Sequence, residues 1–157
     1  MGMEPTCCVP NAQGQDVTSC PVSGTRGKGV PLITLKALLT PPALARLEPE
    51  DAFRLCPDPT CDVVYFSPTQ TYRSRDLKVP VLQKDQAPEV PVCYCFGHTR
   101  ADLTQAAVSD TADALDASIR AHVQAGRCGC EVNNPQGSCC LGNVVTFLRT
   151  LGSREQV

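Results

Sequence analysis

Cysteine carries most of the chemistry that this sequence can perform. The chain of 157 residues holds 11 cysteines, against three tyrosines, four phenylalanines and no tryptophan. An odd number of thiols leaves one over in any full disulfide pairing. The first ten residues contain no long apolar run, so we expect no secretory signal and a cytoplasmic location, where thiols stay reduced. Metal ligation is then the leading use of these side chains, which lie at positions 7, 8, 20, 56, 61, 93, 95, 128, 130, 139 and 140.

Three thiols in the first half of the chain have the spacing of a zinc site. Cys56 and Cys61 form a C-x4-C pair in a proline-rich loop, and Cys20 begins the turn C-P-V-S-G. Structural zinc is bound tetrahedrally by Cys and His ligands that often come in closely spaced pairs. The alternative is that these are buried thiols that act as small apolar side chains without a metal.

The fourth ligand of this site is left open. Ser23 stands where a second thiolate of the C-P-V-S-G turn would be expected. Cys8 or Cys7 then folds back to supply the ligand, or Asp58 or a water closes the shell. The adjacent pair Cys7 and Cys8 is also a candidate for capturing a soft metal, because thiolates prefer soft ions.

A second group of thiols has the pairing expected for an iron–sulfur cluster. Cys93 and Cys95 form a C-x-C pair ahead of a predicted helix, and Cys128, Cys130, Cys139 and Cys140 follow beyond a predicted helical hairpin. Two thiolate pairs suit a 2Fe-2S cluster, which is held by four cysteines. A zinc site with the same ligand count is the alternative, although C-x-C is an unusual zinc-binding spacing.

Three further side chains near these thiols have weaker claims to a role. Cys128 is an alternative ligand, a redox partner, a soft-metal thiol or a solvent-side thiol. We expect His98 to pack at the start of a helix rather than to bind a metal. His122 is expected to be a partly exposed helical residue.

The residues around both groups resemble the CopZ family of copper chaperones. The stretch VCYCFGHT at 92–99 and the stretch CEVNNPQGSCC at 130–140 resemble the iron–sulfur part of that family, itself similar to bacterioferritin-associated ferredoxin. Cys20-Pro21, with CPDPTCDVVYF at 56–66, resembles the family's N-terminal zinc-binding domain. The resemblance spans about residues 20–150, with both cysteine signatures in the family's order and spacing.

The resemblance implies a small zinc-binding domain followed by a helical 2Fe-2S domain, in a protein that handles copper or another soft metal. It implies zinc ligation by Cys20, Cys56 and Cys61. It also implies cluster ligation by Cys93, Cys95, Cys130 and one of the adjacent pair Cys139 and Cys140; we prefer Cys140, with Cys139 as the alternative. Ser23 departs from the family's usual cysteine. The 157 residues also contain no M-x-C-x-x-C motif of the family's C-terminal copper domain, so we expect no Cu(I) delivery by a domain of that kind.

Local sequence patterns predict an α+β fold whose first part is rich in strands. We expect a zinc-binding domain over 1–85, with its family-like part at about 18–82, a linker over 86–92 and a helical 2Fe-2S domain over 93–152. Apolar and β-branched runs predict a small antiparallel sheet with strands at 30–35, 63–66, 71–73 and 78–81, and a short helical turn at 36–39.

The second part of the chain has the periodicity of short helices. Thr99 is placed to cap the first helix, with Asp102 three residues later, and Ser109-Asp110 interrupts it. A second helix is predicted over about 111–125, ending at Gly126. The last is predicted over 140–151, ending at Gly152.

Charge and motifs exclude several classes of function. The net charge of -2, from 14 Lys and Arg against 16 Asp and Glu, leaves no basic surplus for nucleic acid. No segment has the length of a membrane span, and no motif typical of hydrolases, P-loop or dinucleotide-binding proteins, or metalloproteases occurs. An electron carrier or chaperone-like protein is therefore expected rather than an enzyme.

The function predicted on these grounds is one-electron transfer or metal reduction in copper or soft-metal homeostasis. The partner would be a copper or other soft-metal transporter, or a redox protein. One alternative is a non-redox, metal-stabilised adaptor that docks on a metal transporter, a regulator or a ferritin. Another is a thiol-dependent metal reductase that acts through Cys128.

Overall fold

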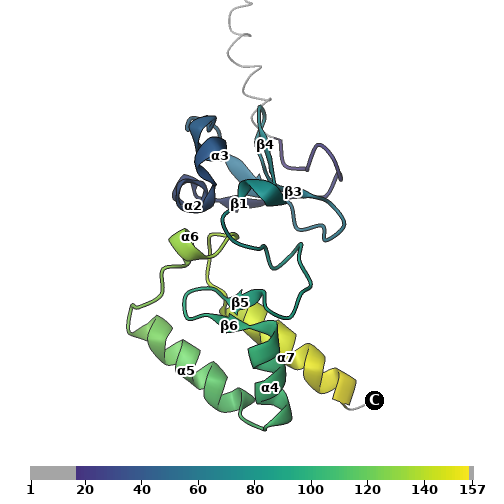
Figure 1. Cartoon of the computed structure of the whole chain (residues 1–157), viewed down its shortest axis with the longest axis vertical. Helices are drawn as coiled ribbons and strands as arrows, with labels where there is room; N and C mark the ends of the chain where they lie inside the picture. Colours follow the sequence, from purple (N-terminus) through teal and green to yellow (C-terminus); the bar gives the residue numbers. More distant parts are fainter. Residues whose placement is uncertain (1–16, 156–157) are drawn as a thin grey trace, which may run out of the picture.

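The structure, a computed structural model, describes residues 17–155 and has two lobes (Figure 1). The N-terminal lobe contains a small sheet covered by two short helices. The C-terminal lobe is built of longer helices around a β-hairpin, and the one-turn helix α6 (Cys130–Asn133) lies between the lobes (Figure 1). The predicted α+β class is confirmed.

A four-stranded antiparallel sheet forms the base of the N-terminal lobe. Its strands follow the order of the chain: β1 (Lys28–Val30), β2 (Phe53–Leu55), β3 (Val63–Phe66) and β4 (Thr71–Arg73). The 3-10 helix η1 (Ser74–Asp76) follows β4. The predicted strands at 63–66 and 71–73 are confirmed, and β3 is buried along its whole length.

The predicted strand at 30–35 is wrong, because the chain enters a helix after Pro31. Helix α2 (Leu32–Leu38) absorbs the predicted helical turn at 36–39. Leu35, Leu38 and Leu39 are buried in the core of this lobe. Their spacing of i, i+3 and i+4 places them on one face of a helix, whereas a strand would alternate. Helix α3 (Pro41–Ala45) follows, and it begins with two prolines, which are tolerated in a first helical turn.

The predicted strand at 78–81 is also wrong. A single β-bridge joins Leu77 to Leu39, and the Lys78 N–H donates to the Leu38 carbonyl at 2.8 Å. Pro80 has no N–H with which to continue a ladder. Val81 is nevertheless buried in the core of the N-terminal lobe, so the segment packs without being a strand.

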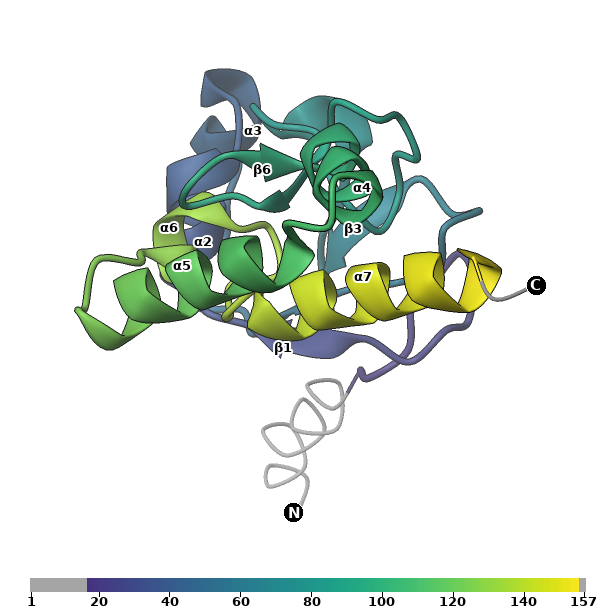
Figure 2. The same cartoon turned by 90° about the horizontal axis from the view of Figure 1, so that it is seen from below.

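Helices and a hairpin make up the C-terminal lobe (Figure 2). Its elements are β5 (Pro91–Cys93), β6 (His98–Thr99), α4 (Arg100–Val108), α5 (Ala112–Gln124) and α7 (Leu141–Glu155). The capping box predicted at Thr99 is confirmed: the Asp102 N–H donates to Thr99 Oγ1 at 3.1 Å, and the Thr99 N–H donates to the Asp102 carboxylate at 3.0 Å. Gly126 follows α5 with φ of 76°, while α7 runs past Gly152, where the sequence predicted its end.

The predicted linker at 86–92 is packed onto the C-terminal lobe. Val90 and Val92 are buried, and Val92 already belongs to β5. The Arg100 guanidinium donates to the carbonyls of Leu82 and Ala87 at 2.8 and 3.1 Å. The division into 1–85, 86–92 and 93–152 stays a prediction, although these contacts hold the connecting segment in place.

Gly27 is a point of close packing beside β2 and β3. A Cβ atom there would lie 2.5 Å from Phe66 Cζ and 2.9 Å from Arg54 Cβ, and Phe66 is fully buried. We expect Gly27→Ala to lower the free energy of unfolding by about 1–3 kcal/mol, because a packed core resists added volume. Urea denaturation measures this change.

Gly29→Ala is the matched control for this prediction. A Cβ atom at Gly29 meets nothing within 4 Å. The substitution is therefore expected to change stability by less than about 1 kcal/mol, in the stabilising direction. Equal destabilisation by the two alanines would contradict the packing described at Gly27.

Candidate metal centres

The three N-terminal thiols predicted to bind zinc lie together in the structure. The Sγ atoms of Cys20, Cys56 and Cys61 are all within 4.8 Å of one another, and all three side chains are buried. Cys20 Sγ and Cys61 Sγ are 3.9 Å apart. Ligands about 2.3 Å from a tetrahedral zinc stand about 3.8 Å from each other, so this spacing fits a shared ion.

Backbone turns bring these thiols together. Cys20 lies in a turn in which the Gly24 N–H donates to the Cys20 carbonyl at 2.8 Å, with Gly24 at φ of 78°. Cys56 directly follows β2, and its N–H donates to the Val64 carbonyl across the sheet at 2.9 Å. The Cys61 N–H donates to the Asp58 carbonyl at 3.1 Å, which closes the proline-rich loop ahead of β3.

The hydroxyl group of Ser23 lies beside this thiol set. Its hydroxyl oxygen is 3.4 Å from Cys56 Sγ and accepts a hydrogen bond from the Thr25 N–H at 3.2 Å. The Asp58 carboxylate instead accepts from Thr60 and Thr25, and the Thr60 N–H holds the pKa of this carboxyl below its ordinary value. Cys7 and Cys8, the other predicted fourth ligands, lie outside the described residues.

The surroundings of Cys20 and Cys61 shift the pKa values of the two thiols in opposite directions. Burial raises the pKa of Cys20, but hydrogen bonds from the N–H groups of Ser23 and Val22 outweigh it and bring the pKa to about 7. Burial raises the pKa of Cys61. Cys20, Cys56 and Cys61 would hold a metal as thiolates, so binding would release the protons that these thiols carry.

Substitution of Ser23 by cysteine tests whether this hydroxyl occupies the fourth corner. We expect Ser23→Cys to bind zinc at least about tenfold more tightly than the unmodified protein, because a fourth thiolate completes the tetrahedron. Competition with a chromophoric chelator measures the affinity.

Ser19→Cys is the control, because Ser19 is exposed and adjacent to the same turn. It is expected to leave the zinc affinity unchanged. No gain from Ser23→Cys, together with a loss on removing Cys7 or Cys8, would place the fourth ligand in the N-terminal segment.

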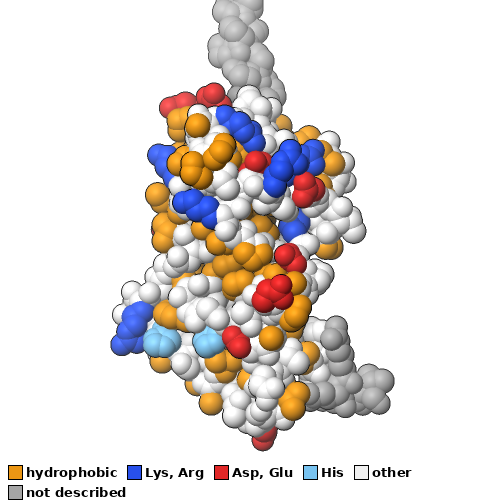
Figure 3. Space-filling view, in the orientation of Figure 1, with side chains coloured by type: hydrophobic (Ala, Val, Ile, Leu, Met, Phe, Trp, Pro, Cys, Tyr) orange, Lys and Arg blue, Asp and Glu red, His pale blue; other side chains and the backbone are white. Residues whose placement is uncertain are grey.

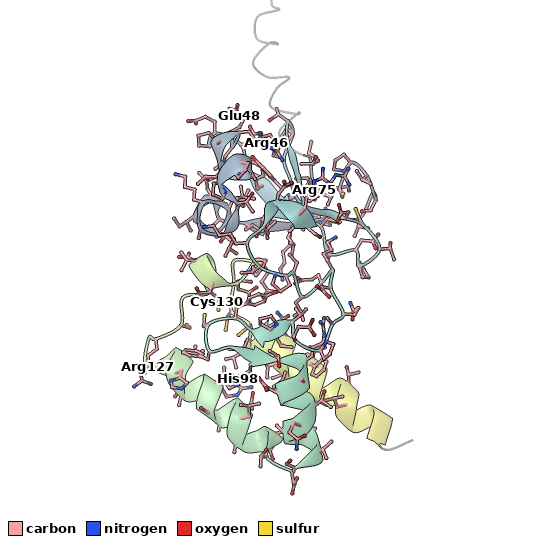
Figure 4. All side chains as sticks on the ribbon, in the orientation of Figure 1. Arg46, Glu48, Arg75, His98, Arg127 and Cys130 are labelled. Carbon is pink, nitrogen blue, oxygen red and sulfur yellow. The ribbon has the colours of Figure 1, made fainter. Side chains whose placement is uncertain are left out.

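The second set of thiols forms two pairs, each of which joins a cysteine of the β5–β6 hairpin to a cysteine of a later segment. Cys95 Sγ lies 3.5 Å from Cys130 Sγ, and the buried thiols of Cys93 and Cys140 lie close enough to shift each other's pKa. The hairpin thus gives one thiol to each pair, and the partners come from α6 and from the residue before α7. Sulfur atoms gather beside Cys130, between α6 and the hairpin (Figure 4). Two neighbouring thiol pairs are the donor set that a 2Fe-2S cluster needs.

Backbone and side-chain amides point at these sulfurs. The Gly129 N–H donates to Cys95 Sγ at 3.2 Å, and the Asn133 amide approaches the same sulfur at 3.6 Å. N–H donors stabilise the negative charge of cluster sulfurs. Asn133 and Gly129 were not predicted from the sequence. The sequence does place both residues within three positions of Cys130.

The close approach of these thiols shifts their pKa values. The hydrogen bond with Cys140 lowers the pKa of Cys93 to about 6, and backbone N–H groups of Phe96 and Cys95 act in the same direction. The same bond, with burial, raises the pKa of Cys140. Burial raises the pKa of Cys130 to about 12, and the nearby Cys95 adds to this.

The remaining predicted residues lie at the edge of this site. Cys139 is exposed, whereas the adjacent Cys140 is 2% exposed. Cys128 is half-buried and lines a surface hollow together with Cys130 and Cys139. His122 is half-buried, as predicted, and stacks on Phe96 with ring centroids 4.5 Å apart.

Both thiol sets therefore fit the groups that the sequence predicts for them. The N-terminal set offers three converging soft ligands, with the Ser23 hydroxyl 3.4 Å from one of them, Cys56. The C-terminal set offers two thiol pairs with N–H donors. These assignments of particular ligands to zinc and to a cluster stay predictions.

Comparison with known proteins gives one consistent result. Residues 17–78 match the family zf_CopZ, described as a zinc binding domain. The X-ray structure of the Archaeoglobus fulgidus CopZ N-terminal domain superimposes with a TM-score of 0.65 and 29% identity, covering 85% of this chain and 97% of that domain. The chain resembles the N-terminal part of CopZ. This confirms the resemblance to CopZ but not the predicted iron–sulfur cluster.

The full-length relative is longer than the region of similarity. The copper chaperone CopZ of Archaeoglobus fulgidus is 29% identical over 123 residues, which are 77% of this chain and 57% of that protein. The chain thus spans little more than half the length of this relative. Among the described residues, none of the helices combines the length and apolar character needed to cross a bilayer.

Proposed function

We propose that the chain is a metal-binding iron–sulfur protein that transfers single electrons, or reduces a metal ion, in the homeostasis of copper or another soft metal. Cys93, Cys95, Cys130 and Cys140 would hold a 2Fe-2S cluster. The observation that carries this proposal is the pairing of these thiols between distant segments: Cys95 Sγ is 3.5 Å from Cys130 Sγ, and Cys93 and Cys140 lie in the same buried cluster.

The N-terminal lobe would hold a zinc ion through Cys20, Cys56 and Cys61. Support comes from the convergence of their sulfurs and from the match of residues 17–78 to a zinc binding domain. The ion would serve stability, because the lobe surrounds it with buried side chains such as Val63 and Phe66. The name of the relative, a copper chaperone, supports a role with copper.

The residues around the cluster site would keep it partly dry. Cys93 and Cys140 are buried, while Cys95 is half-exposed and Cys139 exposed, so one edge faces solvent. When bound, a 2Fe-2S cluster supplies a one-electron couple, which converts Cu(II) to Cu(I) after a redox protein has provided the electron. A partner would approach the open edge. We propose a copper or other soft-metal transporter, or a redox protein, as that partner.

Metal and sulfide analysis tests this function. The protein is purified without oxygen, and iron, acid-labile sulfide, zinc and visible absorption are measured. Two irons, two sulfides and one zinc per chain are expected for a 2Fe-2S cluster and one zinc site. A preparation that holds zinc in both sites and no sulfide would refute electron transfer and favour a metal-stabilised adaptor.

A thiol-dependent metal reductase is the second candidate. It is favoured by the hollow in which the accessible thiols Cys128 and Cys139 lie beside Cys130. Cys128, with the terminal pair Cys7 and Cys8, would then bind the soft metal. Reduction of Cu(II) that persists without the cluster but is lost in Cys128→Ala would support this candidate over electron transfer by the cluster.

A further inference from the structure

The two lobes are joined by a buried hydrogen bond from the sheet. The Tyr65 hydroxyl, on β3, donates to the Pro135 carbonyl at 2.6 Å, and the side chain of Tyr65 is fully buried. Pro135 and the preceding Asn134 are buried as well. Hydrophobic side chains gather at the level where the lobes meet (Figure 3). The contact therefore resembles the interior of one domain rather than a loose contact between two.

Helix α2 makes a second connection to the same segment. Thr34 is buried, and its hydroxyl donates to the Glu131 carbonyl in α6 at 2.6 Å. Gly137 lies so close to α2 that an added Cβ atom would be 2.7 Å from Pro31 Cδ and 2.8 Å from Thr34 Oγ1. The backbone from α6 to Gly137 is thus in direct contact with the N-terminal lobe.

This segment depends on external support for its conformation. Helix α6 is four residues long, and a single isolated helical turn is unstable because nucleation costs more than one hydrogen bond returns. Yet α6 begins with Cys130, and its Asn133 amide approaches Cys95 Sγ. The N-terminal lobe therefore supplies contacts that fix a thiol of the other lobe.

Strand β3 connects the N-terminal thiols to the hydrogen bond between Tyr65 and Pro135. Val63 and Phe66, at the two ends of β3, pack with Cys20, Cys56 and Cys61. Tyr65 lies between them in the strand. A second link comes from Lys84, whose ammonium group donates to the Asp58 carbonyl in the Cys56–Cys61 loop at 2.7 Å.

We propose that the N-terminal lobe acts as a platform that positions Cys130, so that a metal bound by Cys20, Cys56 and Cys61 strengthens binding of the cluster in the other lobe. Thr34 and Tyr65 are the positioning residues, because Thr34 holds the backbone of α6 at Glu131 and Tyr65 holds the backbone just after it at Pro135, and neither hydroxyl bonds a cluster thiol. This inference rests on the proposed function for its cluster, but not for the contact between the lobes.

Gly137→Ala tests the platform at its tightest point, and Gly126→Ala is the matched control. Both glycines have left-handed φ values, of 72° and 76°, so both alanines carry similar backbone strain. A Cβ atom at Gly126 meets nothing within 4 Å. The visible absorption of the cluster is followed after addition of an iron chelator. Gly137→Ala is expected to lose the cluster at least about fivefold faster than Gly126→Ala, because contacts worth about one hydrogen bond or more are lost.

Tyr65→Phe and Thr34→Val remove single hydroxyls with little change in shape. Each is expected to speed cluster loss by about fivefold, which is the loss of one hydrogen bond. Zinc removal from the unmodified protein should also speed cluster loss. The same treatment should change the rate of cluster loss less in Gly137→Ala, because the added Cβ atom has already displaced the two lobes. Equal rates with and without zinc in the unmodified protein would overturn the proposed coupling.

Alkylation of Cys130 separates this inference from the proposed function. The reaction is followed by mass spectrometry in cluster-free protein, with and without one equivalent of zinc, and in Cys56→Ser, where slower alkylation with zinc would mean direct binding at Cys130. Zinc should slow the alkylation of Cys130 in the unmodified protein and in Gly126→Ala, but not in Gly137→Ala. If the protein never holds iron, the proposed function fails and this measurement alone decides on the coupling. If zinc has no effect on Cys130, the platform is refuted whether or not a cluster is present.

Discussion

Cys140→Ser is expected to abolish the 2Fe-2S absorption, whereas Cys139→Ser is expected to retain it. The two cysteines are adjacent in sequence but differ in surroundings. Cys140 is buried in the same cluster as Cys93, which shifts its pKa, while Cys139 is exposed. Cys140→Ser would remove the thiolate that lies next to Cys93 and replace it with a hydroxyl. A 2Fe-2S cluster is held by four protein ligands, so we expect it to be lost.

Iron and sulfide content, visible absorption and electron paramagnetic resonance of the reduced protein measure this difference. We expect less than about a tenth of the iron in Cys140→Ser, because removal of one ligand costs more than 1.4 kcal/mol in binding. Cys139→Ser keeps the same chain length, thiol count and added hydroxyl, so it controls for the substitution itself. Full iron content in Cys140→Ser, with loss in Cys139→Ser, would reverse the assignment.

Cys56→Ser is expected to release zinc and to unfold the N-terminal lobe at lower temperature. Cys56 is fully buried, its Sγ lies within 4.8 Å of those of Cys20 and Cys61, and the Ser23 hydroxyl is 3.4 Å from it. The substitution removes a ligand and leaves a buried hydroxyl in its place. Structural zinc contributes directly to the stability of small domains, so we expect a loss of about 3 kcal/mol or more.

Thermal unfolding and zinc analysis measure this prediction, and Cys128→Ser is its control. Cys128 is half-buried and lies in the other lobe, so its substitution should leave zinc content and unfolding of the N-terminal lobe unchanged. Removal of zinc from the unmodified protein by a chelator should reproduce the effect of Cys56→Ser. A Cys56→Ser protein that retains its zinc and its melting temperature would show that Cys56 is not a ligand.

Spacing along the chain predicted the helices of the C-terminal lobe because their determinants are local. The capping box of Thr99 and Asp102 joins residues three apart, and Gly126 ends α5 by adopting a left-handed φ. The same holds for the turn that places Cys61 near Cys56. Short spacing was therefore sufficient to predict that Cys56 and Cys61 converge, whereas Cys20, 41 residues before Cys61, was added by its C-P-V-S-G turn and by the resemblance to the CopZ family.

Contacts between distant segments were not predictable in this way. Nothing in the local sequence pairs Cys93 with Cys140 rather than with Cys130. Nor does it indicate that Tyr65 reaches Pro135, 70 residues away. The strand predicted at 30–35 failed for a related reason: β-branched residues favour strands locally, but burial of Leu35 and Leu38 against the sheet requires a helical period.

The pairing of the C-terminal thiols, with one pair nested inside the other along the chain, lowers the conformational entropy of the unfolded chain once the pairs are cross-linked. The Cys95–Cys130 pair closes a loop whose ends are 35 residues apart, and the Cys93–Cys140 pair encloses that loop completely. Cross-linking two nested loops restricts the unfolded chain, as a disulfide does, and the restriction grows with loop length. A cluster that joins both pairs would therefore resist release by partial opening, since freeing either outer thiol leaves the inner loop still closed.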